Sequence, residues 1–132
     1  MKGEYILRII FIALLLFVTT FFPAGVKAWT KVDTIDGDEY YLDISSINIK
    51  ERTAWLRVDL RRKADFNALK VSSTRGLVQF DCAQSKMRTL EQSYFAKREL
   101  KGFPLQTNST PTDWRRIPPN TPMTKVIKLV CQ

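Results

Sequence analysis

The sequence contains no histidine, and only two of its 132 residues, Cys82 and Cys131, are cysteine. Histidine is the usual general base of enzymes, so its absence removes the common Ser–His and Cys–His arrangements. If the two cysteines form a disulfide, no thiol remains as a nucleophile or a metal ligand. The five glycines form no Gly-rich phosphate loop, and there is no CxxC motif or serine nucleophile elbow. We therefore expect no catalytic residues, no metal site and no cofactor.

An apolar run near the N-terminus, Ile9–Phe22, has the layout of an export signal. Basic residues precede it, proline and glycine follow it, and Val26 and Ala28 stand at the −3 and −1 positions of a cleavage site. An uncleaved membrane anchor is the alternative, but a spanning helix requires about 20 apolar residues and this run is shorter. We predict that residues 1–28 are a signal peptide and that the mature chain starts at Trp29, with no membrane span after cleavage.

The predicted mature chain is small and basic. Removal of residues 1–28 leaves 104 residues, which suits one domain at 29–132. The removed segment carries three basic residues and one acidic residue, so the mature chain keeps 18 basic against 12 acidic residues, a net charge of about +6. An exported chain of this charge can meet acidic proteins, anionic lipid head groups or acidic polysaccharides, and we expect no nucleic acid partner. The same charge also serves to keep a small domain in solution.

Alternating apolar and polar residues predict short strands along most of the mature chain. They are expected at residues 29–32, 40–43, 47–49, 53–60, 71–82 and 86–95. Asp36 and Gly37, between the first two strands, are typical of a type I′ hairpin turn because both residues tolerate positive φ. The charged residues 61–63 are expected to end the fourth strand, and residues 102–112 are expected to form a loop.

The clearest strand, residues 53–60, separates its side chains onto two faces. The apolar face consists of Ala54, Leu56, Val58 and Leu60. The opposite face consists of Thr53, Trp55, Arg57 and Asp59. A tryptophan on this mostly polar face indicates contact with a neighbouring strand or helix, or an exposed sheet surface.

The C-terminal residues change to a helical period. Apolar side chains recur at i, i+3, i+4, i+7 and i+8, namely Met123, Val126, Ile127, Val130 and Cys131. Thr121 is expected to cap this helix, and Pro122 suits its first position. Cys131 belongs to the apolar stripe, and the alternation of the strand that ends at Cys82 turns that residue to the core. We therefore predict a Cys82–Cys131 disulfide that holds the short helix on the sheet.

Five carboxylates surround the first predicted hairpin, namely Asp33, Asp36, Asp38, Glu39 and Asp43. They lack the spacing of an EF-hand calcium loop. Two of them could act as the acid and base of a glycosidase, but nothing in the spacing sets a pair across a cleft. We interpret the group as a solvated hairpin turn.

The candidate binding surface combines basic and aromatic residues. Its cations are Lys86, Arg88, Lys97, Arg98 and Lys101, with Tyr94 and Phe95 between them. This combination suits the recognition of an acidic protein or another anionic surface. The alternative interpretation is an ordinary amphipathic strand followed by a charged turn. If the first interpretation is correct, reversing three of these charges should weaken binding more at low salt than at high salt.

Several short motifs, taken in their order and spacing, resemble the surface-adhesin protein E-like family of exported proteins from Gram-negative bacteria. The motifs are Trp29, Tyr40–Asp43, Trp55–Leu60, Phe80–Cys82, Arg88, Tyr94, Trp114, Pro118–Pro119 and the helix that ends in Cys131. The resemblance covers residues 29–132. It implies an antiparallel sheet with a C-terminal helix docked by the Cys82–Cys131 bond. It also implies a protein ligand among host extracellular-matrix or serum proteins.

The sequence therefore predicts an α+β domain in which an antiparallel sheet of about six strands carries one C-terminal helix docked by a disulfide. The expected function is non-enzymatic protein binding by an exported protein of the periplasm or the cell surface. The alternative is a periplasmic envelope or stress protein that binds an enzyme or an anionic envelope polymer. The identity of the ligand and the oligomeric state stay open.

Overall fold

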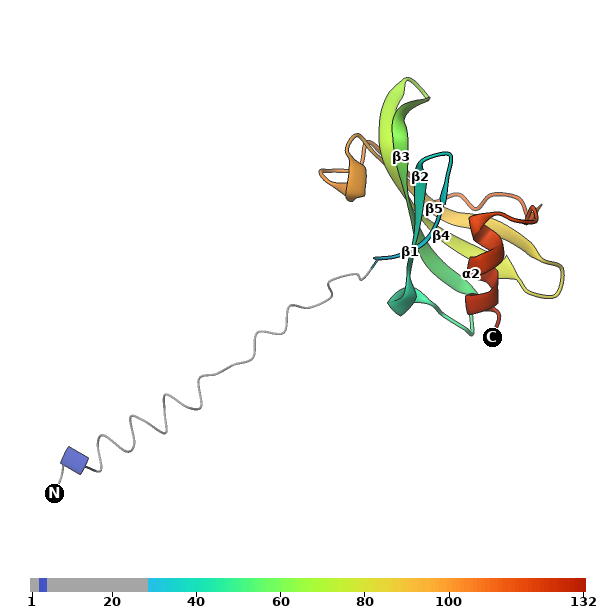
Figure 1. Ribbon diagram of the computed structural model, residues 1–132, viewed down its shortest axis with the longest axis horizontal. Coiled ribbons are helices and arrows are strands. Elements are labelled where there is room, and N and C mark those ends of the chain that lie inside the picture. The colour runs from blue at the N-terminus through green and yellow to red at the C-terminus, as the bar shows by residue number, and fades with distance from the viewer. Residues whose placement is uncertain (1–2, 5–28) are drawn as a thin grey trace.

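One antiparallel sheet of seven strands contains most of the residues that the computed structural model describes, which are 3–4 and 29–132 (Figure 1). The strands are β1 (Trp29–Ile35), β2 (Asp38–Asp43), β3 (Thr53–Phe66), β4 (Leu69–Asp81), β5 (Lys86–Phe95), β6 (Gln106–Asn108) and β7 (Arg115–Arg116). They lie in the order β1-β2-β3-β4-β5-β6, and β7 pairs with β5. The predicted signal peptide lies outside the described residues, apart from residues 3–4.

Three short helical elements complete the fold of residues 29–132. They are the 3₁₀ turns η1 (Ile44–Ser46) and η2 (Arg98–Leu100) and the α-helix α2 (Pro122–Val130). The predicted α+β class, the sheet and the C-terminal helix are confirmed. The β1–β2 turn is also as predicted, because Asp36 and Gly37 both adopt positive φ, at 52° and 87°.

Three predictions about the strands are wrong. The segment 102–112, expected to be a loop, contains β6 in pairing with β5. The charged residues 61–63 do not end β3, which continues to Phe66 in pairing with β4 (Figure 1). A run of charged residues argues against a strand only where one face of that strand is buried. Every residue of β3 after Leu60 is exposed, so the charges there are compatible with a strand. Residues 47–49 form no strand either, because Asn48 makes only a single bridge to Thr53.

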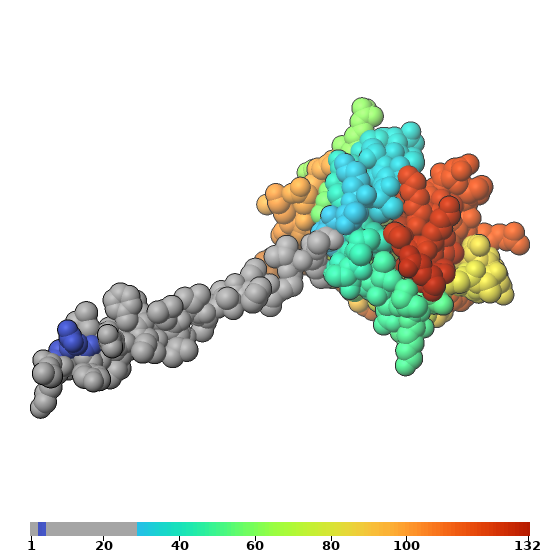
Figure 2. Space-filling model, turned by 60° about the horizontal axis from the view of Figure 1, so that its bottom comes forward, coloured from blue at the N-terminus to red at the C-terminus, as the bar shows by residue number. Residues whose placement is uncertain are grey.

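The core lies between one face of the sheet and α2. Apolar side chains of β2, β3 and β4 pack there against Val126 and Val130 of the helix. They are Leu42, Leu56, Val78 and Phe80. The other side of α2 stays at the molecular surface (Figure 2). Pro122 occupies the start of the helix as expected, but the Thr121 side chain does not cap it. The Thr121 hydroxyl instead donates to the carbonyl oxygen of Pro118, at 2.9 Å.

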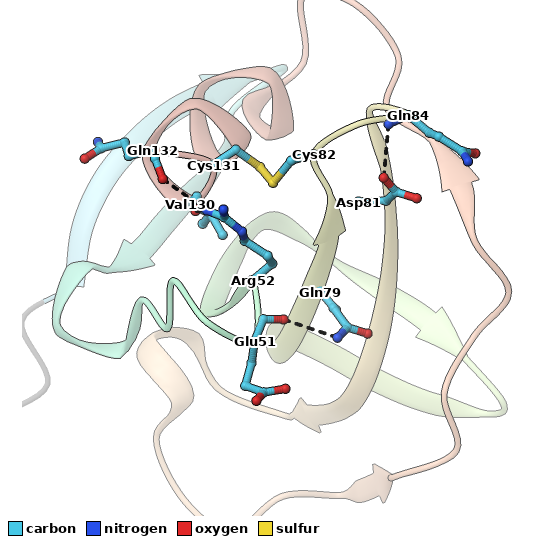
Figure 3. The surroundings of a disulfide bond; sticks show 9 residues. All are labelled: Glu51, Arg52, Gln79, Asp81, Cys82, Gln84, Val130, Cys131 and Gln132. Atoms are coloured by element: carbon cyan, nitrogen blue, oxygen red, sulfur yellow. Dashed lines mark hydrogen bonds between the residues drawn. A yellow bond between two sulfur atoms is a disulfide. The ribbon is translucent and has the colours of Figure 1, made fainter.

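The Cys82–Cys131 disulfide is present and joins the end of β4 to the end of α2 (Figure 3). Arg52, from the turn before β3, reinforces the same junction. Its Nη1 atom donates to the carbonyl oxygens of Val130 and Gln132, at 2.9 and 3.2 Å. A cation at the C-terminus of a helix also meets the negative end of its dipole. The helix is therefore held by a covalent bond, by a charge-assisted cap and by its apolar stripe.

Candidate functional site: an arginine–aromatic face

The face of the sheet opposite α2 carries the odd-numbered residues of β3. Leu56 packs toward the helix, so the neighbouring Trp55 and Arg57 point to the other side. The pairing register adds Tyr41 of β2 and Arg75 of β4 on either side of Arg57. We call this surface the arginine–aromatic face. Its members are Trp29, Tyr41, Trp55, Arg57, Arg75, Arg88 and Trp114.

Each arginine of this face stacks on an aromatic ring. The Arg57 guanidinium carbon lies 3.9 Å from the centroid of the Tyr41 ring. The Arg75 guanidinium lies 4.6 Å from the Trp55 ring, and the Arg88 guanidinium lies 4.7 Å from the Trp114 ring. Such contacts are favourable by about 0.5–2 kcal/mol each, depending on desolvation. They hold long cationic side chains flat across β2 to β5 instead of extended into water.

Arg57 is the buried centre of the face. It is only 9% exposed, and its Nη2 atom donates to Asp59 at 2.9 Å in an equally buried ion pair. The Nε atoms of Arg57 and Arg75 are buried and have no hydrogen-bond partner among the described residues. Asp59 also accepts a bond from the backbone N–H of Glu99 at 3.0 Å, which ties η2 to the same edge of the face.

Glu39 fixes the end of the face nearest η2. Its carboxylate contacts Lys31 at 2.7 Å and Arg98 at 3.0 Å, and it accepts a bond from the Tyr41 hydroxyl. The hydrogen bonds from Lys31 and then from Tyr41 lower the pKa of Glu39 to about 2. The same bond to Glu39 raises the pKa of Tyr41. The carboxylate is therefore ionised at neutral pH and anchors three side chains at once.

The five cations predicted as a binding surface lie at two separate ends of β5. Lys86 and Arg88 belong to the start of this ten-residue strand, and Lys97, Arg98 and Lys101 follow its end. A strand of that length spans roughly 30 Å. Arg88 joins the arginine–aromatic face, since it also donates from Nε to Gln79 at 2.8 Å. The other three lie around η2, beside Arg61 and Lys63 of β3, at a shallow hollow of about 480 Å³.

Most of this face was not found from the sequence. Period-two alternation placed Trp55 and Arg57 on one surface, and Arg88 was singled out by its charge. Trp29, Tyr41 and Arg75 were missed as site residues because they meet Arg57 and Trp55 only through the register of four strands, β1 to β4. A partial signal was available in β3, where Trp55 and Arg57 stand at alternate positions of one strand.

A second hollow, of about 240 Å³, lies on the helix side of the sheet. Its lining contains no carboxylate and includes Tyr40, Val58, Gln92, Arg115 and Met123.

Among residues 3–4 and 29–132, no three potential metal ligands lie close enough together to form a metal site. The predicted acidic hairpin has structural contacts instead: Asp33 pairs with Lys125 at 3.0 Å, and Asp43 accepts from the N–H of Ser45. In the described part of the chain no helix is long and apolar enough to cross a membrane.

The fold and the face together define a small disulfide-linked sheet protein with arginines stacked on aromatic rings across one side of the sheet. Comparison with known protein families gives the particular class. Residues 29–132 match the family model of the surface-adhesin protein E, and the chain belongs to that family. The predicted resemblance is thereby confirmed. A search of curated protein sequences finds no significant match.

Solved structures of Haemophilus influenzae protein E are similar in fold. Its crystal form II has a TM-score of 0.56 at 15% sequence identity, over 81% of this chain and 96% of that one. The structure of protein E from the non-typeable organism has a TM-score of 0.53 at 14% identity, over 83% and 79% of the two chains. A further structure of protein E gives 0.52 at 12% identity, over 81% and 85%. At these identities the likeness concerns the fold alone.

Proposed function

We propose that this protein is an exported, non-enzymatic adhesin that binds a host extracellular-matrix or serum protein through its arginine–aromatic face. Membership of a surface-adhesin family supports adhesion as the general role. The observation that carries the site is the series of stacked pairs, Arg57 on Tyr41, Arg75 on Trp55 and Arg88 on Trp114. Arginine, tryptophan and tyrosine are the residues most enriched where binding energy concentrates in protein interfaces.

The charge of the face defines the partner's chemistry. Arg75 has one weak carboxylate contact, to Glu91 at 3.9 Å, and Arg88 has no ion pair in the described residues. A partner that presents carboxylates between apolar groups can pair with these arginines while it covers the rings. Because the stacked side chains are already ordered, binding costs little additional side-chain entropy. Two further groups of cations raise the local potential and speed encounter with an acidic partner. They are Lys86, beside Arg88, and the residues around η2, Lys97, Arg98 and Lys101.

Export is part of the proposal and rests on residues 1–28 and on the disulfide. A stable disulfide requires an oxidising compartment. The competing role is that of a periplasmic envelope or stress protein that binds an enzyme or an anionic envelope polymer. Within this role, the cations around the η2 hollow favour an anionic polymer over an enzyme as the ligand. Protease treatment of intact cells separates the two roles. Digestion of the protein from the outside supports adhesion, whereas protection until the outer membrane is opened supports the periplasmic role.

Binding should be measured with the exported protein against immobilised fibronectin, collagen and serum proteins. Arg75→Ala and Arg88→Ala should each weaken the observed binding about tenfold or more, as expected for arginines at the centre of an interface. Lys128→Ala, in the last turn of α2 away from the face, is the matched control and should bind like the parent protein. Thermal melts of all three variants exclude unfolding. Normal binding by both face variants would reject this surface as the site.

A further inference from the structure

Phe103 is the most exposed large apolar residue of the described chain, with 94% of its surface open to solvent. Leu105, two residues later, is 42% exposed. An aromatic side chain in water forgoes all of its burial energy, and the proposed adhesin site makes no use of this one. Single exposed apolar residues are common on proteins, so the exposure requires a second observation before it has meaning.

The loop that presents Phe103 is fixed in place. Leu105 donates its N–H to the carbonyl oxygen of Tyr94 at 2.8 Å. The preceding η2 turn contains two non-glycine residues at positive φ, Glu99 at 60° and Leu100 at 59°. Their backbone N–H groups bond to Asp59 at 3.0 Å and to Ser73 at 3.1 Å.

Both of these acceptors are buried, Asp59 at 1% exposure and Ser73 at 0%. Two buried polar side chains of the sheet therefore hold a turn whose backbone is unfavourable. Backbone of this kind persists where the surrounding structure over-determines it. The exposure of Phe103 is consequently a property of an anchored loop.

A cluster of cations surrounds the base of this loop. We call it the distal basic cluster, and its members are Arg61, Lys63, Lys97, Arg98 and Lys101. Figure 1 shows the loop after β5 beside the projecting β3–β4 hairpin. Only Arg98 and Lys101 have carboxylate partners in the described residues, Glu39 and Glu99 respectively. The cluster thus keeps a net positive charge at the base of the loop that carries Phe103.

We propose that this end of the molecule docks on an anionic lipid surface. Phe103 and Leu105 enter the head-group region, and the distal basic cluster contacts the lipid phosphates. The combination of an apolar tip with a basic surround is the form of a peripheral membrane anchor. Lysines and arginines close to an anionic leaflet each add to the attraction, within about one Debye length. A soluble polyanion would bind the cations and leave Phe103 in water, so it explains the basic cluster but not the exposed phenyl ring.

This docking goes beyond the proposed adhesin site, because it uses none of the stacked arginines. Lys97, Arg98 and Lys101 are shared only as steering charge for the adhesin site, so Phe103→Ala separates the two proposals. The test is co-sedimentation of the exported protein with phosphatidylcholine vesicles containing phosphatidylglycerol at about 30%, against vesicles of phosphatidylcholine alone. We expect binding to the anionic vesicles only. Phe103→Ala and the double variant Lys63→Glu, Lys97→Glu should each weaken it about tenfold or more. Ile49→Ala, at a 44% exposed apolar residue, and Lys128→Glu are matched controls and should bind normally.

Insertion itself is measured with Phe103→Trp. The tryptophan emission that this substitution adds should shift to the blue on mixing with anionic vesicles, and lipids brominated near the head group should quench it. Three results overturn the proposal. The parent protein fails to sediment with either vesicle, or Phe103→Ala binds as well as the parent, or the added tryptophan stays in water. Loss of binding in the charge variant with full binding in Phe103→Ala would identify a purely electrostatic polyanion site instead.

Discussion

The arginines of the arginine–aromatic face are positioned before any partner arrives. Arg57 is held by Tyr41 on one side of its plane and by Asp59 at its edge, within a strand whose neighbours lie on both sides. A charge at this depth is tolerated because its partner is buried with it. Removal of either partner alone is therefore strongly destabilising, because it leaves the other charge buried without a counter-charge.

We predict that Asp59→Ala lowers the free energy of unfolding by about 3–5 kcal/mol, the usual cost of breaking a buried ion pair. The substitution strands the Arg57 guanidinium and also removes the acceptor of the Glu99 N–H. Asp65→Ala is the control, since the Asp65–Lys70 pair is exposed, with side-chain exposures of 70% and 67%. That change should cost less than about 0.5 kcal/mol. Urea denaturation measures both, and equal costs would contradict the structural role given to Asp59.

Glu39 predicts a pH dependence of stability. Its folded-state pKa of about 2 lies below the ordinary value of 4.5, so the ionised form stabilises the fold. That contribution is complete above about pH 4.5 and is lost as the pH falls toward 2. Hydrogen bonds also lower the pKa values of Asp33 and Glu99, so the protein as a whole should weaken in acid.

The measurement compares Glu39→Gln with the parent protein by urea denaturation at pH 7, 4.5 and 2.5. The variant should be less stable at pH 7. The difference should shrink at pH 2.5, because Glu39 of the unfolded chain is then protonated and this proton uptake offsets most of the stabilisation. Glu51→Gln, at an exposed carboxylate that forms no ion pair in the described residues, should follow the parent at every pH. A constant difference between Glu39→Gln and the parent would reject this account of the carboxylate.

At the scale of the elements, α2 depends on its anchors more than on its own propensity. A nine-residue helix is too short to be stable in isolation. Cys131→Ser should lower the free energy of unfolding by roughly 2–5 kcal/mol, the usual cost of losing a native disulfide in a small secreted domain. The double variant Cys82→Ser, Cys131→Ser should cost the same, because one bond is lost in both. A melting temperature within about 2 °C of the parent would show that the helix is held by other contacts.

The buried face of α2 made the helix predictable from the sequence. The apolar stripe from Met123 has nearly the limits of the helix, because its period reports burial against the sheet. The strand at 86–95 also has the predicted limits, although most of its residues are only half-buried. The outer part of β3 and the short strands β6 and β7 are exposed, so hydrophobic pattern carries no information about them. The distal basic cluster was split for the same reason. Arg61 and Lys63 were expected to end a strand, and only the continued pairing of β3 with β4 brings them beside Lys97.

At the scale of the whole molecule, the two proposed surfaces carry different kinds of cationic side chain. Arginines stacked on rings occupy the broad face of the sheet, and lysines and arginines without stacking partners gather at one end beside Phe103. Stacked arginines suit a protein partner with defined geometry, whereas a loose group of cations suits a fluid anionic surface. A protein with both could remain at an envelope surface while it holds a second macromolecule.

The boundary of the exported molecule provides the last prediction. Trp29 is the first residue of β1, it pairs with Asp43, and its ring lies 5.7 Å from the Arg57 guanidinium. Cleavage after Ala28 leaves this contact intact, whereas cleavage a few residues later would remove part of the arginine–aromatic face. The intact mass of the exported protein should therefore equal residues 29–132 less two hydrogens for the disulfide. Ala28→Arg should retain the uncleaved chain, because signal cleavage requires a small residue at the −1 position. A protein that keeps residues 1–28 would contradict the signal assignment, and one that begins beyond Trp29 would also contradict the extent of the face.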